Sequence, residues 1–581
     1  MLQALMEYGA RFDSEPGFKT REVRWRVDLG KDGKLLSIIP LGDGKRGQML
    51  ERCPDMHNMN AGGRAHFLIE SAQTAVLLFK TDEDEKKIAA AKLRHDYFVA
   101  LLDAASAAVP YLAGLVAALH SESSRNAIRE ALAVNKTKPS DWIVWRVGDF
   151  DPRTDQATQS WWRQWRVEDM GAAGKLGKSA ATVMRCFLTG ELVQPLSTHP
   201  KISGLSGVGG LSMGDVMIGF DKAAFSSFGF EQSANAAISA VAAQQYADGL
   251  NDLIRNHSRK LANAVVVHWF NAPIGKGDDP LAWLDGLESD EQTEAAAQSK
   301  AQVLLDAIKS GQRTDLGDNC YYAMTLSGAS GRVMVRDWME GSFEELVRNV
   351  GAWFADLQIV ARNGDGIAND PKFMAVGGAL VRELKDLPAP TAAILWKSAV
   401  ARRSIPRPLL AQAIARFRAD LVDKDQPPFN HARMGLIKAY FIRLTLGGNL
   451  TVTAYLNPDH PDPAYHCGRL LAVFSNLQRA ALGDVGAGVV QRYYVAASQT
   501  PGLILGRLVA NARNHLGKLD GGLAYWFENQ IADVMGHLGD CIPRILNLEG
   551  QGLFALGYYQ QLANMRTKGQ KADTTVSGEA K

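Results

Sequence analysis

The chain of 581 residues is 46% hydrophobic and 22% charged, a composition typical of a soluble protein with room for roughly three or four domains. Its 64 basic and 62 acidic residues leave a net charge of only +2, which argues against a protein that wraps naked nucleic acid alone, unless its positive charge is segregated or partners hold the nucleic acid. Five scattered cysteines without metal-binding spacing indicate a reduced, cytoplasmic protein, and the sequence shows neither a signal-peptide pattern nor an apolar run that could span a membrane.

The N-terminal region is predicted to combine a β-hairpin with helices. Residues 22–39 form two runs of alternating or apolar side chains around a polar turn at 31–34, which is the pattern of two paired strands. Residues 84–120 have the pattern of a long helix interrupted at Pro110, and 141–147 is predicted to be a strand.

A polar loop within residues 53–67 carries Asn58, Asn60 and Arg64. Asn can hydrogen-bond a base edge through two atoms and Arg can reach guanine, so these side chains are candidates for contact with duplex DNA. Turns rich in Asn and Gly are also common in loops that bind nothing, and the residues alone favour that plainer interpretation.

Two segments further along could be functional or structural. Trp161 and Trp165 share a helix face beside two arginines, as in a stacking site, but large aromatics more often anchor a core or a subunit interface. The segment 172–179 fits a loosened P-loop pattern in which Ala172 replaces the first glycine. Because it does not follow a buried strand, we expect a flexible basic loop rather than a nucleotide site.

The segment 186–235 is the most distinctive of the chain, because it contains a glycine-rich loop. Five glycines lie between residues 204 and 214 and allow the positive φ angles that a backbone needs for close approach to another polymer. Such a loop suits contact with phosphates or a groove, although composition alone favours a surface crossover with several tight turns. The candidate contact residues in this loop are Lys201, Gly207, Gly209, Gly210 and Ser212.

The central region contains an acidic stretch, a second hairpin and a capped helix. Residues 273–300 are polar and acidic, which indicates a flexible insertion, with a docking surface as the alternative. Residues 319–337 alternate around the turn SGASG, and Ser342 with Glu345 forms a capping-box pattern at the start of the next helix.

From about residue 375 onward the pattern is almost purely helical. Positive charge is concentrated between residues 438 and 518, which hold eight basic and three acidic side chains. Basic side chains interleaved with amides on a rigid helix face suit the backbone of a single nucleic-acid strand, although an ordinary solvated face explains the pattern equally well. The eight basic residues are Lys438, Arg443, Arg469, Arg479, Arg492, Arg507, Arg513 and Lys518.

Several segments, taken in order, resemble one protein family. The succession TGE, HPKI-x-G, glycine loop and FxSFGxEQxxN resembles the large subunit of the type I-C CRISPR surveillance complex, Cascade. The same family is indicated by MLQALMEY, by RVMVRDWMEGSFEELVRNVGAWFADLQI, by RMGLIKAYFIR, and by PAYHCGRLLAVFSNLQRAA followed by GLFALGYYQQ. These segments run from Met1 to Gln561, so the resemblance covers nearly the whole chain.

The resemblance implies a non-catalytic subunit that recognises the short PAM motif on duplex DNA, helps unwinding and R-loop formation, holds the displaced strand and recruits a helicase-nuclease. The implied partners are crRNA, the target DNA, the backbone and crRNA-processing subunits of Cascade, and a small subunit. In this family the small subunit can be the internally translated C-terminal region, for which Met434 and a non-methionine codon upstream are both suitable starts. The two loops would then lie at the PAM duplex, and the eight basic residues along the displaced strand.

We therefore predict an α+β multidomain protein whose mixed α/β N-terminal and central region, with β-hairpins, is followed by an all-helical C-terminal bundle. The predicted divisions are 1–150, 151–375, a helical connector at 376–433, a bundle at 434–566 resembling the small subunit, and a disordered tail at 567–581. No HExxH, GxSxG or Cys/His motif supports catalysis, and no metal or cofactor is expected. Two alternatives stay open: an enzyme acting on nucleic acid, and an assembly scaffold that contacts no DNA.

Overall fold

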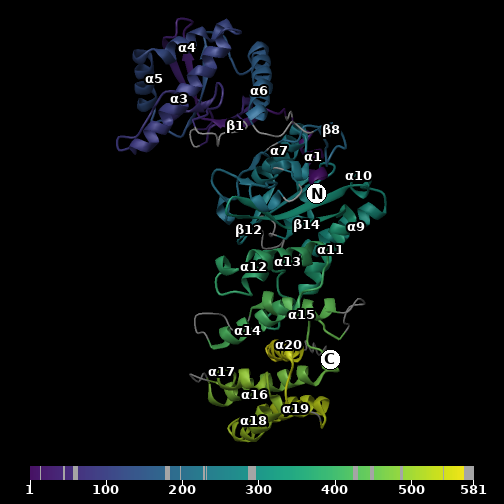
Figure 1. The fold of residues 1–581 in the computed structure, drawn as a ribbon. Coiled ribbons are helices and arrows are strands. Elements are labelled where there is room, and N and C mark those ends of the chain that lie inside the picture. Colours follow the sequence, from purple (N-terminus) through teal and green to yellow (C-terminus); the bar gives the residue numbers. More distant parts are fainter. Residues whose placement is uncertain are drawn as a thin grey trace, which may run out of the picture. The chain divides into compact units, whose positions relative to one another are not determined.

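The chain folds into two compact units, and Figure 1 labels their helices and strands. Unit 1 comprises Met1–Gly204 and Leu211–Arg255, and unit 2 comprises Leu205–Gly210 and Asn256–Lys581. The predicted division 151–375 includes residues of both units, and the boundaries predicted at residues 150, 375 and 433 stay predictions. The computed structural model describes residues 1–12, 15–43, 46–56, 63–176, 183–196, 198–226, 229–230, 232–284, 296–422, 430–444, 451–483, 488–540 and 542–567.

A four-stranded sheet and the helices beside it form the N-terminal part of unit 1. Its strands lie in the order β3 (Leu35–Pro40), β2 (Trp25–Leu29), β6 (Trp142–Val147) and β5 (Glu70–Ser71), with β2 and β6 parallel. Trp25, Val27 and Leu29 of β2 are buried and alternate with half-buried residues, so the alternation in the sequence marks the face that packs on the core. The helices of this part are α2 (Ala72–Ala75), α3 (Glu85–Ser106), α4 (Ala113–His120), α5 (Glu122–Val134) and α6 (Gln156–Leu176).

The rest of unit 1 consists of short strand pairs and two closely packed helices. Helix α1 (Leu2–Gly9) lies against α7 (Ala240–Asn256), where a Cβ on Gly249 would come within 2.7 Å of the carbonyl oxygen of Leu5. The hydroxyl of Tyr8 donates a hydrogen bond of 2.9 Å to Asp252 across the same contact. The antiparallel strand pairs are β1 (Phe18–Val23) with β4 (Gln48–Pro54), β7 (Met184–Arg185) with β8 (Leu192–Val193), and β9 (Lys201–Ile202) with β10 (Asp215–Val216).

Unit 2 begins with an antiparallel meander that leads into a capped helix. Strands β11 (Ser258–Leu261), β12 (Ala264–Phe270), β13 (Cys320–Ala329) and β14 (Arg332–Ser342) pair in chain order. Helix α11 (Phe343–Leu357) starts directly after β14, where the side chain of Ser342 accepts a hydrogen bond from the backbone N–H of Glu345. The apolar stripe of α11 is buried along its length, as its periodicity predicts.

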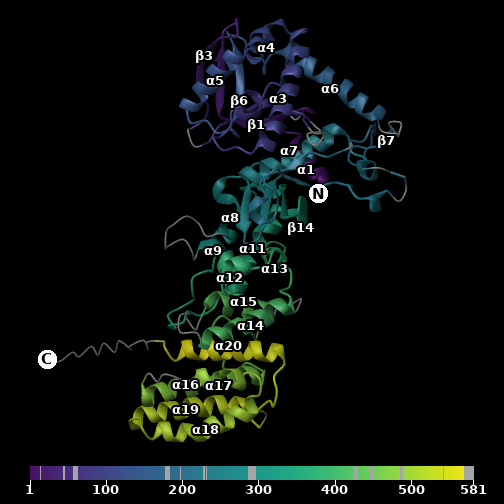
Figure 2. The ribbon, with the colours of Figure 1, turned by 60° about the vertical axis from the view of Figure 1, so that its left-hand side comes forward.

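The remainder of unit 2 is helical. Figure 2 shows α20 (Leu548–Asn564) between α14 (Arg407–Val422) and α15 (His431–Leu444) on one side and α16 (Pro463–Leu482) on the other, and α20 packs against all three. A single hydrophobic core extends from the sheet through these helices. The other helices are α8 (Pro280–Trp283), α9 (Ala296–Lys309), α10 (Thr314–Gly317), α12 (Phe373–Gly378), α13 (Ala389–Val400), α17 (Val489–Ala497), α18 (Pro501–Leu516) and α19 (Gly521–Leu538).

The fold confirms the predicted α+β class, with a mixed α/β front and a helical C-terminal region. Trp162 is fully buried, stacks on Phe67 and donates to the carbonyl of Gly17 at 2.7 Å, so the tryptophan cluster is part of the core. The prediction of a flexible loop at 172–179 is wrong for its first residues, because α6 continues through Leu176. The acidic stretch 273–300 includes a buried helical turn at Pro280–Trp283, and its residues 285–295 lie outside the described residues.

Candidate nucleic-acid interface

The loop proposed to read duplex DNA is anchored at both ends by side chains of unit 1. On the C-terminal side, Arg64 forms a two-pronged ion pair with Asp169 of α6, at 2.9 and 3.1 Å. On the N-terminal side, the backbone N–H of Met56 donates to Nδ1 of His66 at 3.0 Å. Asn58 and Asn60 lie outside the described residues. Arg64 is therefore a structural anchor here, and its hydrogen bond to Asp169 raises the pKa of its guanidinium.

A buried polar network lies beneath these anchors. Arg21 pairs with Asp55, and its guanidinium carbon lies 4.0 Å from the ring centre of Trp142. The side chain of Glu70 accepts hydrogen bonds from the backbone N–H groups of His66, at 3.1 Å, and of Ser71, at 2.8 Å. Burial lowers the pKa of His66 to about 4, so its ring is neutral and Nδ1 can accept the hydrogen bond from Met56.

Within unit 1, the first part of the glycine loop is a narrow β-ribbon. Lys201 pairs with Val216 and Ile202 with Asp215. Gly214 has φ of +86°, and a Cβ there would lie 3.1 Å from both Lys201 and the carbonyl oxygen of Ile202. The carbonyl of Lys201 also accepts a hydrogen bond of 3.3 Å from Asn251 of α7. The backbone of Lys201 is thus fixed, and its side chain is half-buried. Ser212 is exposed.

Within unit 2, the glycines of the same loop approach another part of the chain. Gly209 has φ of +91°, and a Cβ there would lie 2.8 Å from the carbonyl oxygen of Gly328 on β13. A Cβ on Gly328 would in turn overlap the backbone of Gly210. Gly209 and Gly210 therefore bring the loop backbone close to β13 of the same chain. Gly207 and Gly209 keep exposed backbone.

Three of the eight basic residues assigned to the displaced strand have buried side chains, which argues against that assignment. Arg469 is 2% exposed and donates to Asp533 and Gln561, each at 2.8 Å. Arg443 pairs with Asp356 at 2.7 Å and lies over the ring of Trp353. Lys438 is 3% exposed and donates to the carbonyl of Ala355 at 3.5 Å. Each fills a position where neighbouring helices meet, which leaves it no surface for a nucleic-acid strand.

The other five basic residues are exposed at the surface of unit 2. Helix α18 and the turn after it present a face of basic and amide side chains, since Arg507, Asn511, Asn514 and Lys518 are all exposed at helical spacing. The exposed basic residues are Arg479 on α16, Arg492 on α17, Arg507 and Arg513 on α18, and Lys518 after α18. This basic α18 face is compatible with a charged nucleic-acid backbone.

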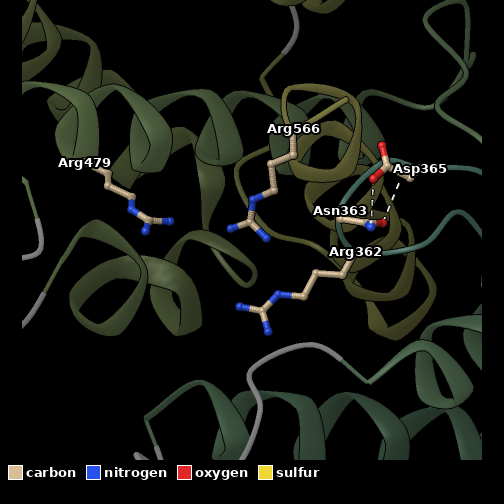
Figure 3. Close-up of a pocket in the computed structure, with 5 residues that line it drawn as sticks. All are labelled: Arg362, Asn363, Asp365, Arg479 and Arg566. Atoms are coloured by element: carbon tan, nitrogen blue, oxygen red, sulfur yellow. Dashed lines mark hydrogen bonds between the residues drawn. The ribbon is translucent and has the colours of Figure 1, made fainter. Parts of the chain in front are cut away.

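A further basic site was not predicted from the sequence, because it joins distant segments. Arg362, Arg479 and Arg566 point into one cavity of about 520 Å3 in unit 2 (Figure 3). The cavity is also lined by Asn363 and Asp365, which hydrogen-bond to each other at 3.0 Å. Arg362 lies in the loop after α11, and Arg566 follows α20, so only Arg479 belonged to the basic stretch seen in the sequence.

The described part of the chain shows no group of three or more His, Cys, Asp or Glu side chains arranged to bind a metal ion. Nor does any helix in the described ranges have the length and apolar character needed to cross a bilayer.

Comparison with known families identifies the chain as a CRISPR-associated protein. The matching model is that of the CRISPR-associated protein family Cas_Csd1, and it covers residues 3–566. Because the match spans nearly the whole sequence, the chain belongs to the Cas_Csd1 family, and this membership supports a component of a multi-subunit Cascade complex. A search of curated proteins finds no significant match.

Proposed function

We propose that this chain is the non-catalytic large subunit of a type I-C Cascade complex. In this proposal it recognises the PAM on duplex DNA, assists unwinding and R-loop formation, holds the displaced strand and recruits a helicase-nuclease. The observation that carries the proposal is the family match over residues 3–566. The guide RNA pairs with the target over a long stretch, so the protein subunit needs only a short motif and contacts to DNA backbones. A net charge of +2 with a segregated basic α18 face suits that division of labour.

The proposed partners follow from the same role. They are crRNA, the target duplex and its displaced strand, the backbone and crRNA-processing subunits, a small subunit and the helicase-nuclease. The small subunit is proposed to be the C-terminal region of this chain, made separately from about Met434.

The function is tested by assembling the crRNA complex with and without this chain and measuring its binding to duplexes with a randomised motif beside the protospacer. We expect motif-selective binding only when the chain is present. Binding that ignores the motif, or that survives omission of the chain, would contradict PAM recognition.

The anchored loop permits a matched pair of variants in the same assay. Arg64→Ala removes the guanidinium, whereas Asp169→Asn weakens the ion pair and leaves Arg64 in place. Loss of motif selectivity in the first variant alone would assign DNA contact to Arg64. Loss in both would show that the anchored shape of the loop matters, and loss in neither would remove this loop from the site.

An assembly scaffold without PAM recognition is the second candidate function. It is favoured by the ion pair of Arg64 with Asp169 and by the packing of Gly209 and Gly210 on β13, which account for these residues without DNA. In that case omission of the chain would prevent assembly of the complex without changing motif selectivity.

A further inference from the structure

Three arginines from separate segments of unit 2 converge at the surface. Figure 3 shows the guanidinium groups of Arg362, Arg479 and Arg566 directed into the same cavity, with Asp365 turned toward Asn363 beside them. Three positive charges and one negative charge leave the lining at +2. The three guanidinium groups share one cavity and repel one another, so the surrounding fold must hold them in place.

The position of Arg362 is imposed by a tight loop pressed on the end of α20. The backbone N–H of Ala361 donates to Gly366 at 2.9 Å and closes the loop. Gly364 has φ of +82°, and a Cβ there would lie 2.8 Å from the backbone nitrogen of Thr567 and would overlap the carbonyl of Ala563. Only glycine allows this approach, which brings Arg362 next to Arg566.

The position of Arg479 is imposed by the contact between α16 and α20. A Cβ on either Gly468 or Gly557 would overlap backbone atoms of the facing helix, so the two helices touch at their backbones. Near the end of the contact, Nδ2 of Asn476 lies 3.8 Å from the sulfur of Met565. Arg479 is on the next turn of α16, and Arg566 follows Met565. Both helices end beside the cavity.

The electrostatics of the cavity favour an anion. Burial lowers the pKa of Arg566, and the positive charges of Arg362 and Arg479 lower it further. The carbonyl ends of α16 and α20 offset only part of this repulsion, since the effect of a helix terminus is about half a charge. Each arginine also makes another interaction within the chain. A guanidinium carries five N–H donors, so one such interaction leaves donors for a phosphate.

We propose that Arg362, Arg479 and Arg566 form a binding site for phosphate groups of a single DNA strand. Guanidinium groups match phosphate oxygens with paired N–H donors, and a cavity of about 520 Å3 has room for a phosphate with its sugar. Phosphate groups are the same at every nucleotide, so binding at this site is expected to be independent of base sequence. The site deepens the proposed function, because it adds a contact for the displaced strand.

The test uses the full-length chain and a labelled oligo-dT strand, with affinity measured over a range of salt concentrations. The double variant Arg362→Gln/Arg566→Gln is compared with Arg382→Gln/Arg402→Gln, which removes two exposed arginines of unit 2 outside the cavity. Each lost phosphate contact makes the slope of log affinity against log salt shallower by about 0.7, which is about fivefold in affinity at 0.1 M salt. We expect this change in the first variant only.

Two further arms separate the possible outcomes. The variant Arg362→Lys/Arg566→Lys keeps the charge and is expected to restore most of the affinity, which a misfolded cavity would not. Inorganic phosphate is compared with chloride at equal ionic strength, and specific competition by phosphate would mark a site for the free ion as well as for DNA. An unchanged slope and affinity in the glutamine variant would overturn the site. PAM selectivity is measured in the assembled complex, whereas strand binding is measured on the chain alone. A failure of PAM selectivity would therefore not affect the evidence for this phosphate site.

Discussion

Burial decides which basic side chains of the helical region can meet a nucleic acid. Sequence spacing groups Arg469 with Arg479, yet Arg469 is 2% exposed and satisfied by partners inside the bundle, whereas Arg479 is exposed. A buried charge is costly unless it is paired, which explains why Arg469 and Arg443 each contact a carboxylate. Lys438 has a weaker arrangement, since its ammonium donates only a long hydrogen bond to Ala355.

Lys438 is expected to make the stability of unit 2 depend on pH. Burial lowers its pKa to about 8, although Asp356 acts in the opposite direction. The unfolded chain, with a lysine pKa of about 10.4, therefore binds more protons than the folded chain between pH 8 and 10.4. Under this linkage the free energy of unfolding rises with pH across that window, and below pH 8 the charged lysine imposes its full cost.

Lys438→Met is accordingly expected to stabilise the protein at pH 7, by up to about 3 kcal/mol, with a smaller gain at pH 9.5. Urea unfolding gives the free energy of unfolding of the wild type and of the variant at both pH values. The difference between the two proteins at each pH removes the contribution of the other titrating groups. Asp356 keeps its ion pair with Arg443 in the variant, so no new unpaired charge is created. A variant that is less stable at pH 7, or whose advantage does not depend on pH, would contradict this account.

At the scale of elements, the contact between α16 and α20 organises the helical region. Gly468 faces the carbonyl of Phe554, and Gly557 faces the carbonyl of Tyr465. Because neither glycine has a side chain, each helix makes room for the backbone of the other. This contact buries Phe554 and Tyr558 and also sets the distance between Arg479 and Arg566. Small residues at a helix contact thus control both packing and the position of a surface site.

Gly468→Ala is expected to destabilise unit 2 by about 1–3 kcal/mol, because the added methyl group has to push the two backbones apart. Gly506→Ala is the matched control, since Gly506 lies within α18 and nothing lies within 4 Å of its Cβ position. This second change is expected to stabilise by about 0.5–1 kcal/mol through helix propensity. Thermal unfolding should therefore shift in opposite directions, and two shifts of the same sign would show that the glycine contact is not the controlling feature.

Local patterns predicted the elements well, whereas the site depends on distant contacts. The alternation in β2 and the capping residue Ser342 act on their own neighbours, so the hairpin and the start of α11 could be predicted from the sequence. The burial of Arg469 and the meeting of Arg362 with Arg566 depend on how distant helices pack. No spacing rule encodes such contacts, and burial of a charged side chain runs against its average preference.

At the scale of the whole molecule, the hydrophobic core of unit 2 continues across the predicted boundary at residue 433. Met434 is fully buried in the first turn of α15, and a Cβ on Gly435 would overlap the carbonyl of Leu357 in α11. Just before it, Arg433 pairs with Asp420 of α14 at 2.6 Å, and both side chains are buried. A product that starts at Met434 would lack this ion pair and the whole of α14.

Helix α14 makes further contacts with the region that follows. Arg418 donates to Ser498 and Gln551, each at 2.9 Å, and the ring of Phe417 meets the ring of Tyr494 edge to face at 5.2 Å. Without α14 the buried Tyr494 and the adjacent surface of α20 become accessible to water. The loss of this apolar contact lowers the stability of the isolated fragment.

We therefore expect a fragment of residues 406–567 to unfold at a higher temperature than a fragment of 434–567, and to bind less of a dye that reports exposed apolar surface. Both fragments lack α11, so the comparison isolates the contribution of α14 and of the Arg433–Asp420 pair. Adding purified Cascade backbone subunits to the shorter fragment tests whether a partner covers the apolar surface that α14 covers in the full chain. Equal unfolding temperatures and equal dye binding would show that α14 contributes little, and would support a boundary at residue 434.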